Sequence, residues 1–362
     1  MIRTFSTNNF LLALLCLAAS PVLVAADDWT QWGGSDGRNM ISGATGLPDA
    51  FVPGKKRPNE GGIEQPTTEN IRWTARLGLF AYGNPTVARG KVFVGTDDGL
   101  LPLIDDRLKR TRGGMVQCLD EATGKLLWKL VTPKREKLPK GAHFSHQFLG
   151  TCSSPTVDGD RVYVVTSACE LVCLDVRGQA DGNDGPFTEE GRYMVPPDKP
   201  PVELNSTDAD IIWIFDMIDE AGVVPHDAAS CSALIHGDVV YVGTSNGVDG
   251  PHTKMPAPLA PSLIALDKHT GKLLAADGEK IGTRMFHAQW ASPSLGQVNG
   301  RTLIFFGGGD GVCYAFEALT EKPPELGEPP AAKDAVLKTV WSYDCNPPEY
   351  RLRDGKPIPY YD

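Results

Sequence analysis

The sequence has no surplus of basic residues. Its 35 Lys and Arg are outnumbered by 45 Asp and Glu, which gives a formal net charge of −10 at pH 7. The densest basic run, Lys134–Lys140, also contains Glu136. Since clustered positive charge is what attracts polyanions, neither nucleic acid nor an anionic membrane surface is expected as a partner.

Cysteine is too sparse for a disulfide framework. The eight cysteines are scattered along 362 residues, no two are adjacent, and there is no C-x-x-C-H for covalent haem. Cys118 and Cys173 occupy a repeat position that Ala265 and Ala315 fill elsewhere. Because alanine can occupy the same position, Cys118 and Cys173 are interpreted as small buried core residues rather than as redox centres.

Two familiar enzyme motifs are also missing. There is no H-E-x-x-H and no G-x-x-x-x-G-K-[ST]. Phe305–Gly311 is rich in glycine, but it lies between two apolar runs of strand type. No helix N-terminus follows that could receive a phosphate, so a hairpin turn is predicted there.

The apolar run Phe10–Ala19 stands near the N-terminus, after Arg3 and before the small residues Val24-Ala25-Ala26. It is shorter than the roughly 20 residues that a membrane-spanning helix needs. Residues 1–26 are therefore predicted to be a signal peptide, cleaved before Asp27. The mature product is expected to be periplasmic or secreted, without a stable membrane anchor.

The rest of the chain is organised by a repeat of four short strands. In the first copy a small-residue strand is followed by V-F-V-G, by Q-C-L-D and, after a T-G turn, by a strand that carries Trp128. The copies cover about 84–130, 152–215, 230–275 and 290–343. A sheet of four short strands cannot bury both faces alone, and radial packing of such sheets is a β-propeller. The predicted fold is all-β, with four-stranded antiparallel blades.

The domain division follows from the repeat. Residues 27–69 are predicted to be an N-terminal extension with a tryptophan-rich start, and residues 70–362 the propeller. Polar insertions rich in proline and glycine are assigned to surface loops. They are Gly178–Asp208, Asn246–Pro261 and Glu321–Asp334.

The combination of S-P-x-V, V-Y-V-G, A/C-L-D, T-G-K and W resembles the repeat of pyrroloquinoline-quinone-like (PQQ-like) propellers. That group includes quinoprotein alcohol dehydrogenases and the propeller lipoprotein of the outer-membrane β-barrel assembly machinery. W-T-Q-W-G-G at 29–34 and F-H-A-Q-W-A-S-P at 286–293 look most like exported PQQ-like repeat proteins of bacteria such as planctomycetes. The resemblance implies the fold, but it says little about activity, because one fold hosts many functions.

The segment Asn70–Leu77 reads as a strand around Trp73 and matches the outer strand of a blade. Because the first and fourth repeats already have outer strands at Trp128 and Trp341, Trp73 is surplus. We therefore expect an incomplete ring, in which these four blades belong to a longer propeller of about six to eight.

Histidines precede the inner strand of three repeats, at His143 and His146, His226, and His287. If these loops meet at one mouth of the hub, His146, His226, His287 and Trp290 are candidates for binding a metal or small ligand. The alternative interpretation is that the histidines only hydrogen-bond backbone carbonyls and that Trp290 only packs in the core.

An acidic, glycine-rich loop provides a second candidate site. Asp175, Asp181, Asn183 and Asp184 are oxygen donors of the kind that Ca²⁺ requires, although their spacing is not that of an EF-hand. A solvated acidic turn is the alternative.

The resemblance to quinoproteins implies an adjacent Cys-Cys disulfide, a tryptophan platform for the quinone and a bound Ca²⁺. No adjacent cysteine pair exists here, and the calcium ligands and catalytic aspartate match no motif. We therefore expect a non-catalytic binding or assembly scaffold for a protein or cell-envelope ligand, with no catalytic residues and no cofactor assigned. A PQQ- and Ca²⁺-dependent oxidoreductase and a carbohydrate-binding module remain the alternatives.

Overall fold

The computed structural model describes residues 28–58, 61–319, 335–347, 352–353 and 356–357. The predicted signal peptide, the insertion Glu321–Asp334 and residues 358–362 lie outside the described residues. Helices within the described part are limited to one or two turns. They are η1 (Gln65–Thr67), η2 (Leu101–Leu103), η3 (Gln147–Leu149), η4 (Gly178–Ala180), α1 (Glu190–Tyr193), α2 (Met217–Ala221) and η5 (Ile281–Arg284).

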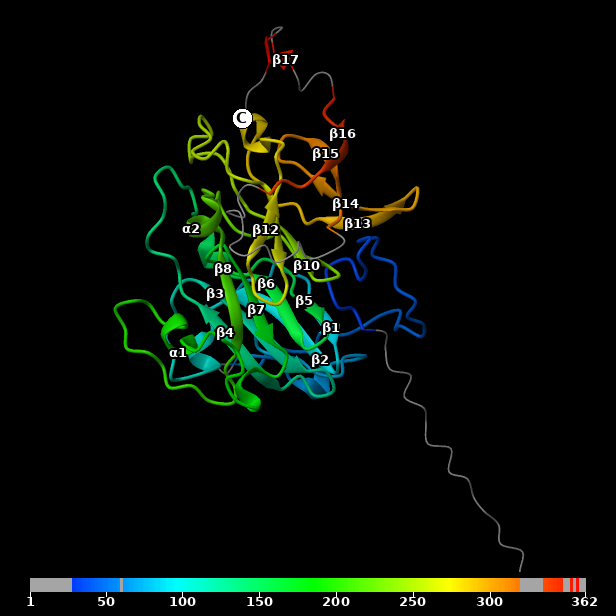
Figure 1. The fold of residues 1–362 in the computed structure, drawn as a ribbon. Coiled ribbons are helices and arrows are strands. Elements are labelled where there is room, and N and C mark those ends of the chain that lie inside the picture. Colours follow the sequence, from blue (N-terminus) through cyan, green and yellow to red (C-terminus); the bar gives the residue numbers. More distant parts are fainter. Residues whose placement is uncertain (1–27, 59–60, 320–334, 348–351, 354–355, 358–362) are drawn as a thin grey trace, which may run out of the picture.

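Four antiparallel sheets of four strands follow one another along the chain (Figure 1). Blade 1 consists of β1 (Thr86–Ala88), β2 (Lys91–Asp97), β3 (Gly114–Asp120) and β4 (Leu126–Thr132). Blade 2 consists of β5 (Thr156–Asp158), β6 (Arg161–Val165), β7 (Glu170–Asp175) and β8 (Ile211–Asp216). Blade 3 consists of β9 (Leu234–His236), β10 (Val239–Gly243), β11 (Leu263–Asp267) and β12 (Leu273–Ala276). Blade 4 consists of β13 (Ser294–Val298), β14 (Arg301–Gly307), β15 (Val312–Glu317) and β16 (Thr339–Asp344). The predicted all-β fold of four-stranded blades is confirmed.

A separate two-stranded hairpin follows the blades and consists of β17 (Leu352–Arg353) and β18 (Lys356–Pro357). In Figure 1 it stands away from the blades, near the label C.

Within each blade, consecutive strands pair, and the third strand has a register shift against the fourth. In blades 1 and 2 the shift comes directly after Cys118 and Cys173, which lie opposite Trp128 and Trp213. Both thiols are buried, and burial raises their pKa. A small side chain at this position leaves room for the tryptophan across the strand, which is why alanine can replace it.

The hydrophobic core lies between neighbouring blades. One cluster joins blades 1 and 2 around Trp128 and Val164, a second joins blades 2 and 3 around Trp213 and Val240, and a third joins blades 3 and 4. Strands that face a neighbour on each side are therefore buried almost continuously, as in β10. This burial explains why the middle strands read as unbroken apolar runs in the sequence.

Tryptophan indoles connect successive units at the rim. Each ring packs on a glycine of the next unit's turn, at Gly124, Gly178 and Gly271, where a Cβ would collide with the ring. Each also donates a hydrogen bond from Nε1 to a backbone carbonyl: Trp73 to Glu121 (2.8 Å), Trp128 to Val176 (3.0 Å) and Trp213 to Lys268 (3.1 Å). The strand predicted around Trp73 is wrong, because residues 71–77 belong to no strand. Trp73 nevertheless docks on blade 1 in the same way that Trp128 docks on blade 2 and Trp213 docks on blade 3.

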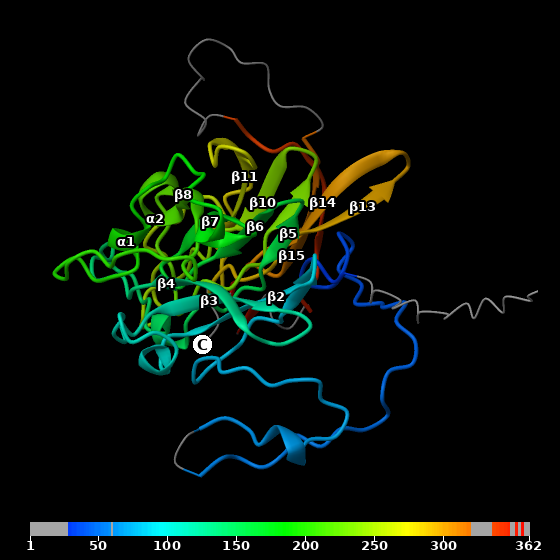
Figure 2. The same ribbon diagram turned by 90° about the horizontal axis from the view of Figure 1, so that it is seen from below.

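The tryptophan-rich start crosses the inner ends of all four blades. Trp29 pairs with Val87 of β1, the Thr30 carbonyl accepts from Val157 of β5, and the Asp36 carbonyl accepts from Leu295 of β13. Arg38 donates to the Trp32 carbonyl within the same segment (2.5 Å) and to carbonyls that border β9 and β13: Ala233 (2.8 Å), Pro293 (3.2 Å) and Ser232 (3.4 Å). The segment therefore ties the blades together at the hub. Beyond it, Figure 2 shows the chain leaving the blades as a long irregular segment before it returns to β1.

The surfaces of the blades differ in exposure. On β16 of blade 4, Trp341 and Tyr343 are 40% and 67% exposed, whereas Trp128 of blade 1 is fully buried. Within the described part of the chain, no helix is apolar and long enough to cross a membrane.

Candidate functional site at the histidine cluster

Five histidines gather where the loops that enter blades 2, 3 and 4 meet. His143 and His146 lie between β4 and β5, His226 between α2 and β9, and His287 between η5 and β13. His252 comes from the insertion between β10 and β11. Four of the rings form a continuous group, with centroids 5.0 Å apart for His143 and His226, 4.5 Å for His226 and His287, and 4.4 Å for His252 and His287.

Main-chain pairing holds these loops together. His143 pairs with His226, Pro225 with Asn246, and Gly247 with Ala288. A Cβ on Gly247 would lie 2.5 Å from the Cβ of His226, so only glycine permits this approach. Because the pairing is made by backbone, the positions of the histidines are set before any ligand arrives.

His226 lies at the centre of the cluster and is 1% exposed. Its Nδ1 lies 2.7 Å from the carbonyl oxygen of Val248, and its Nε2 lies 2.8 Å from Nε2 of His287. A carbonyl can only accept, so the network assigns the proton of neutral His226 to Nδ1. The lone pair of His226 Nε2 then accepts a hydrogen bond from His287.

The Asp227 carboxylate provides negative charge beside the imidazoles. Oδ1 accepts a hydrogen bond from Ser145 at 2.9 Å and lies 3.0 Å from Nδ1 of His146. Oδ2 lies 3.6 Å from Nε2 of His226. Burial opposes ionisation of Asp227, but the Ser145 hydroxyl and the adjacent imidazoles together lower its pKa.

The two central imidazoles favour their neutral form. Burial lowers the pKa of His226, and the neighbouring His287 and His143 lower it further, against the opposing effects of Val248 and Asp227. Burial also lowers the pKa of His287, with His252 contributing. Neutral imidazole is the protonation state that coordinates metals such as zinc.

Trp290 packs against the cluster and fixes its backbone. Its ring centroid is 5.0 Å from that of His287, and its Nε1 donates to the carbonyls of Ala228 (3.0 Å) and His226 (3.3 Å). The indole is therefore a positioning group in contact with both neighbouring loops.

These residues do not fit a quinone held by calcium. The donors that converge here are imidazole nitrogens, whereas Ca²⁺ takes oxygen ligands. The seven described cysteines are all unpaired. The histidine cluster and the cysteines thus supply neither the ion site nor the disulfide that the resemblance to quinoproteins implies.

The structure brings together His226, His287 and Trp290, and it places His146 near them through Asp227. Two members could not be identified from the repeat. His252 lies in the insertion between β10 and β11, outside the loops that lead into the inner strands, and Asp227 gave no signal beyond being next to His226.

The four candidate calcium ligands lie in a network of ion pairs. Asp175 is 2.6 Å from Arg161, and Arg177 lies 2.6 Å from Asp181 and 3.8 Å from Asp184. Asn183 donates to Glu190 at 2.9 Å. Guanidinium groups thus supply positive charge to these carboxylates. Asp175 is fully buried at the end of β7, so it is not part of a solvated turn.

Residues 243–247 spell G-x-S-x-G, a spacing that marks a nucleophilic serine when it joins a strand to a helix. Here β10 ends at Gly243, and a loop follows. The Oγ of Ser245 is buried and has no hydrogen-bond partner among the described residues. Because no described residue is hydrogen-bonded to this Oγ and could act as its base, Ser245 is not assigned a catalytic role.

A second concave region lies between the end of β4 and α1, and its lining includes the partly buried Glu170. Burial raises the pKa of Glu170, although its Oε2 accepts hydrogen bonds from Tyr193 at 2.6 Å and Thr166 at 3.1 Å. These partners satisfy the carboxyl group within the fold, which indicates a structural role.

The PQQ-like family model described as outer membrane protein assembly factor BamB matches residues 112–333, more than half of the chain. No curated protein sequence matches the chain.

Similar solved structures include quinohemoprotein alcohol dehydrogenase ADHIIG from Pseudomonas putida HK5 (TM-score 0.44, 13% identity, 88% of this chain and 40% of that chain). Quinohemoprotein alcohol dehydrogenase from Comamonas testosteroni has a TM-score of 0.42 and 12% identity, over 91% of this chain and 51% of that chain. BamB from Moraxella catarrhalis has a TM-score of 0.35 and 10% identity, over 75% of this chain and 51% of that chain. The chain spans about half, or less, of the length of these structures.

Proposed function

The chain belongs to the PQQ-like family described as outer membrane protein assembly factor BamB, and from this premise we propose that it is an exported, non-catalytic binding scaffold. The ligand is a protein or another component of the cell envelope. The family description names assembly of outer-membrane proteins, and a scaffold of that kind works by presenting a surface rather than by turning over a substrate.

The observation that carries the proposal is the connected surface formed by the loops at the hub mouth. The loop that enters blade 2 pairs with the loop that enters blade 3 at His143–His226. The insertion between β10 and β11 pairs with the blade 3 loop at Pro225–Asn246 and with the blade 4 loop at Gly247–Ala288. Loops held in place before binding lose little conformational entropy when a partner docks. Such preorganisation is useful to a scaffold whether or not chemistry takes place there.

The same loops expose apolar side chains. Leu138, between β4 and β5, is 37% exposed, and Leu259, in the insertion of blade 3, is 73% exposed. The two loops are in contact, because a Cβ on Gly141 would lie 3.1 Å from Pro256. Exposed apolar groups on a rigid polar surface are typical of protein-docking sites.

Export is part of the proposal and has its own test. Residues 1–26 have the pattern of a signal peptide. The full chain, expressed in a Gram-negative host, should be recovered from the periplasm with Asp27 as its first residue. A cytoplasmic product that retains Met1 and Arg3 would contradict this.

The binding function is tested with immobilised mature protein and a detergent-free envelope extract. A retained protein should be lost with the double variant Leu138→Ser and Leu259→Ser. It should be kept with Leu47→Ser, a matched change at a residue that is 70% exposed in the N-terminal extension. Equal retention by both variants would contradict docking at the hub mouth.

The enzyme and glycan alternatives are distinguished in parallel. A scaffold shows no dye-linked alcohol oxidation after incubation with PQQ and Ca²⁺, whereas a quinoprotein oxidoreductase does. Retention by immobilised envelope polysaccharide, with no protein retained, would instead indicate a carbohydrate-binding module.

A further inference from the structure

We propose that His226, His252 and His287 bind one divalent first-row transition-metal ion, for which Zn²⁺ is the probe. The proposal goes beyond the scaffold function and does not depend on it. It rests on the arrangement of three imidazoles that come from three separate segments of the chain.

The ligand atoms are already close. One ring nitrogen from each histidine lies within 4.8 Å of the others. Two nitrogens bound to the same tetrahedral zinc, each at about 2.0–2.1 Å, lie roughly 3.4 Å apart. Small rotations of the rings, without movement of the backbone, would therefore place all three nitrogens around one ion.

The contact between His226 and His287 is the core of the site. Their Nε2 atoms are 2.8 Å apart, which requires a shared proton in the absence of metal. Val248 holds the proton of His226 on Nδ1, so His226 Nε2 offers its lone pair. When the ion binds, it takes the place of the proton between the two Nε2 atoms. The proton of neutral His287 then resides on Nδ1, so His287 Nε2 also offers a lone pair to the ion.

The surroundings match those of metal-binding histidines. A ligating imidazole usually donates its second N–H to a carbonyl or carboxylate, as His226 does to Val248 at 2.7 Å. Asp227 brings a carboxylate oxygen to 3.6 Å from His226 Nε2, so it can serve as a fourth ligand or balance the charge of the ion. His226 is buried, whereas His252 and His287 are partly exposed, which leaves a path from solvent.

The backbone is strained at the residues that complete the site. Asp227 and His252 have φ values of 56° and 58°, a left-handed conformation that costs free energy for residues other than glycine. Strain of this kind persists where the surrounding structure imposes it, and it is concentrated at binding and catalytic sites. Here it turns two polar side chains toward the same group of imidazoles.

The test is zinc titration by isothermal calorimetry on mature protein that carries no histidine tag and has been treated with EDTA. Wild-type protein should bind one Zn²⁺, and Co²⁺ in its place should give the visible absorption of a tetrahedral nitrogen site. His252→Asn removes one ligand while allowing the left-handed backbone. It should weaken zinc binding at least about tenfold.

His269→Asn is the matched control, because His269 pairs with Asp238 on blade 3 outside the cluster and its side chain is 63% exposed. This variant should bind zinc as the wild-type protein does. Circular dichroism and melting of all three metal-free proteins verify that they are folded. Absence of one-to-one binding, or equal weakening by the two substitutions, would overturn the proposal and leave the cluster as an imidazole network that shares a proton.

Discussion

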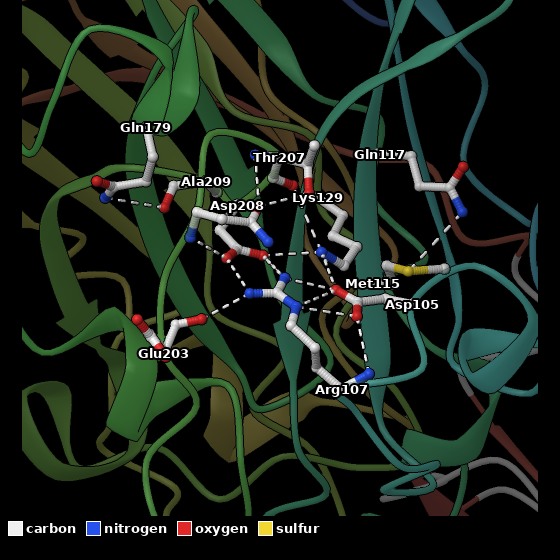
Figure 3. A network of polar contacts seen from close by, with 11 residues as sticks. Asp105, Arg107, Met115, Gln117, Lys129, Gln179, Glu203, Thr207, Asp208 and Ala209 are labelled. Carbon is white, nitrogen blue, oxygen red and sulfur yellow. Dashed lines mark hydrogen bonds and ion pairs between the residues drawn. The ribbon is translucent and has the colours of Figure 1, made fainter.

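Lys129 is the residue whose removal should most sharply test the reasoning about blade packing. It lies on β4, is fully buried, and its ammonium group is 2.6 Å from Asp105 and 2.8 Å from Asp208 (Figure 3). Asp208 comes from the chain that leads into β8, so the charge pair links blade 1 to blade 2. The perturbation is Lys129→Met, which retains most of the aliphatic length and removes the charge.

The expected loss follows from the carboxylates left behind. Asp208 is fully buried and Asp105 nearly so, and each keeps Arg107, at 2.8 Å and 2.6 Å respectively. Burial opposes the charge of Asp105, but hydrogen bonds from Arg107 and Lys129 hold its pKa well below the usual range. Breaking a buried pair costs about 3–5 kcal/mol, and because Arg107 remains, we expect about 3 kcal/mol.

The assay is equilibrium unfolding in urea near neutral pH. Lys125→Met, on the exposed side of the same hairpin, is the matched control and should change stability by less than about 0.5 kcal/mol. Asp208→Asn completes a double-mutant cycle with Lys129→Met. The two effects should be less than additive, with a coupling of about 1–3 kcal/mol, because both variants remove the same interaction.

A loss below about 1 kcal/mol for Lys129→Met would refute the argument. It would mean that the ammonium group is solvated in the folded state or that its attraction only balances its desolvation. Additive effects in the cycle would show that Lys129 and Asp208 do not stabilise each other.

Three further predictions concern the hub, the rim and the pH dependence. Arg38→Lys should lower the free energy of unfolding by about 1.5–3 kcal/mol, because one ammonium group cannot replace the guanidinium group that donates to several hub carbonyls, including that of Ala233. An unchanged urea midpoint would show that the hub does not need the guanidinium group. Trp213→Phe keeps an aromatic ring but loses the hydrogen bond to the Lys268 carbonyl, so it should lower the free energy of unfolding by about 1 kcal/mol in the same assay. An unchanged free energy of unfolding would contradict a stabilising role for that hydrogen bond. Burial raises the pKa of Asp210 to about 6, so the folded state holds this proton more tightly than the unfolded chain, and stability should fall as the pH rises from about 4 to about 6. Asp210→Asn should reduce the difference between the urea midpoints measured at about pH 4 and above about pH 6. If the variant leaves this difference unchanged, Asp210 is not the group that causes the pH dependence.

Much of the fold could be predicted because the repeat is local. Each blade is an up-and-down sheet of consecutive strands, so the alternation of apolar runs and tight turns contains most of the pairing information. The small residue at Cys118 and Cys173 marked the third strand, and a tryptophan marked the fourth. The segment around Trp73 shows the limit of this reasoning, since it has the pattern of a strand and the docking contact of one, but it pairs with no strand in the part of the chain that the structure describes.

The hub could not be predicted in the same way. The role of Arg38 depends on carbonyl groups near Ala233 and Pro293, which lie about two hundred residues or more away in the sequence. Nothing in the local pattern of W-T-Q-W-G-G indicates that the segment crosses the inner ends of four blades. Backbone carbonyls have no sequence signature, so such a contact becomes visible only in the folded chain.

By itself, the sequence determined the blade repeat, the acidic surface charge and the presence of histidines in three equivalent loops. The tertiary structure decided which of those histidines meet. His226 and His287 are 61 residues apart and share a 2.8 Å contact, whereas His146 reaches the cluster only through Asp227. His252 joins them from an insertion outside the repeat. Strand pairing is dictated by neighbours in the chain, but a site assembled from separate loops depends on how those loops pack, and that is a property of the whole fold.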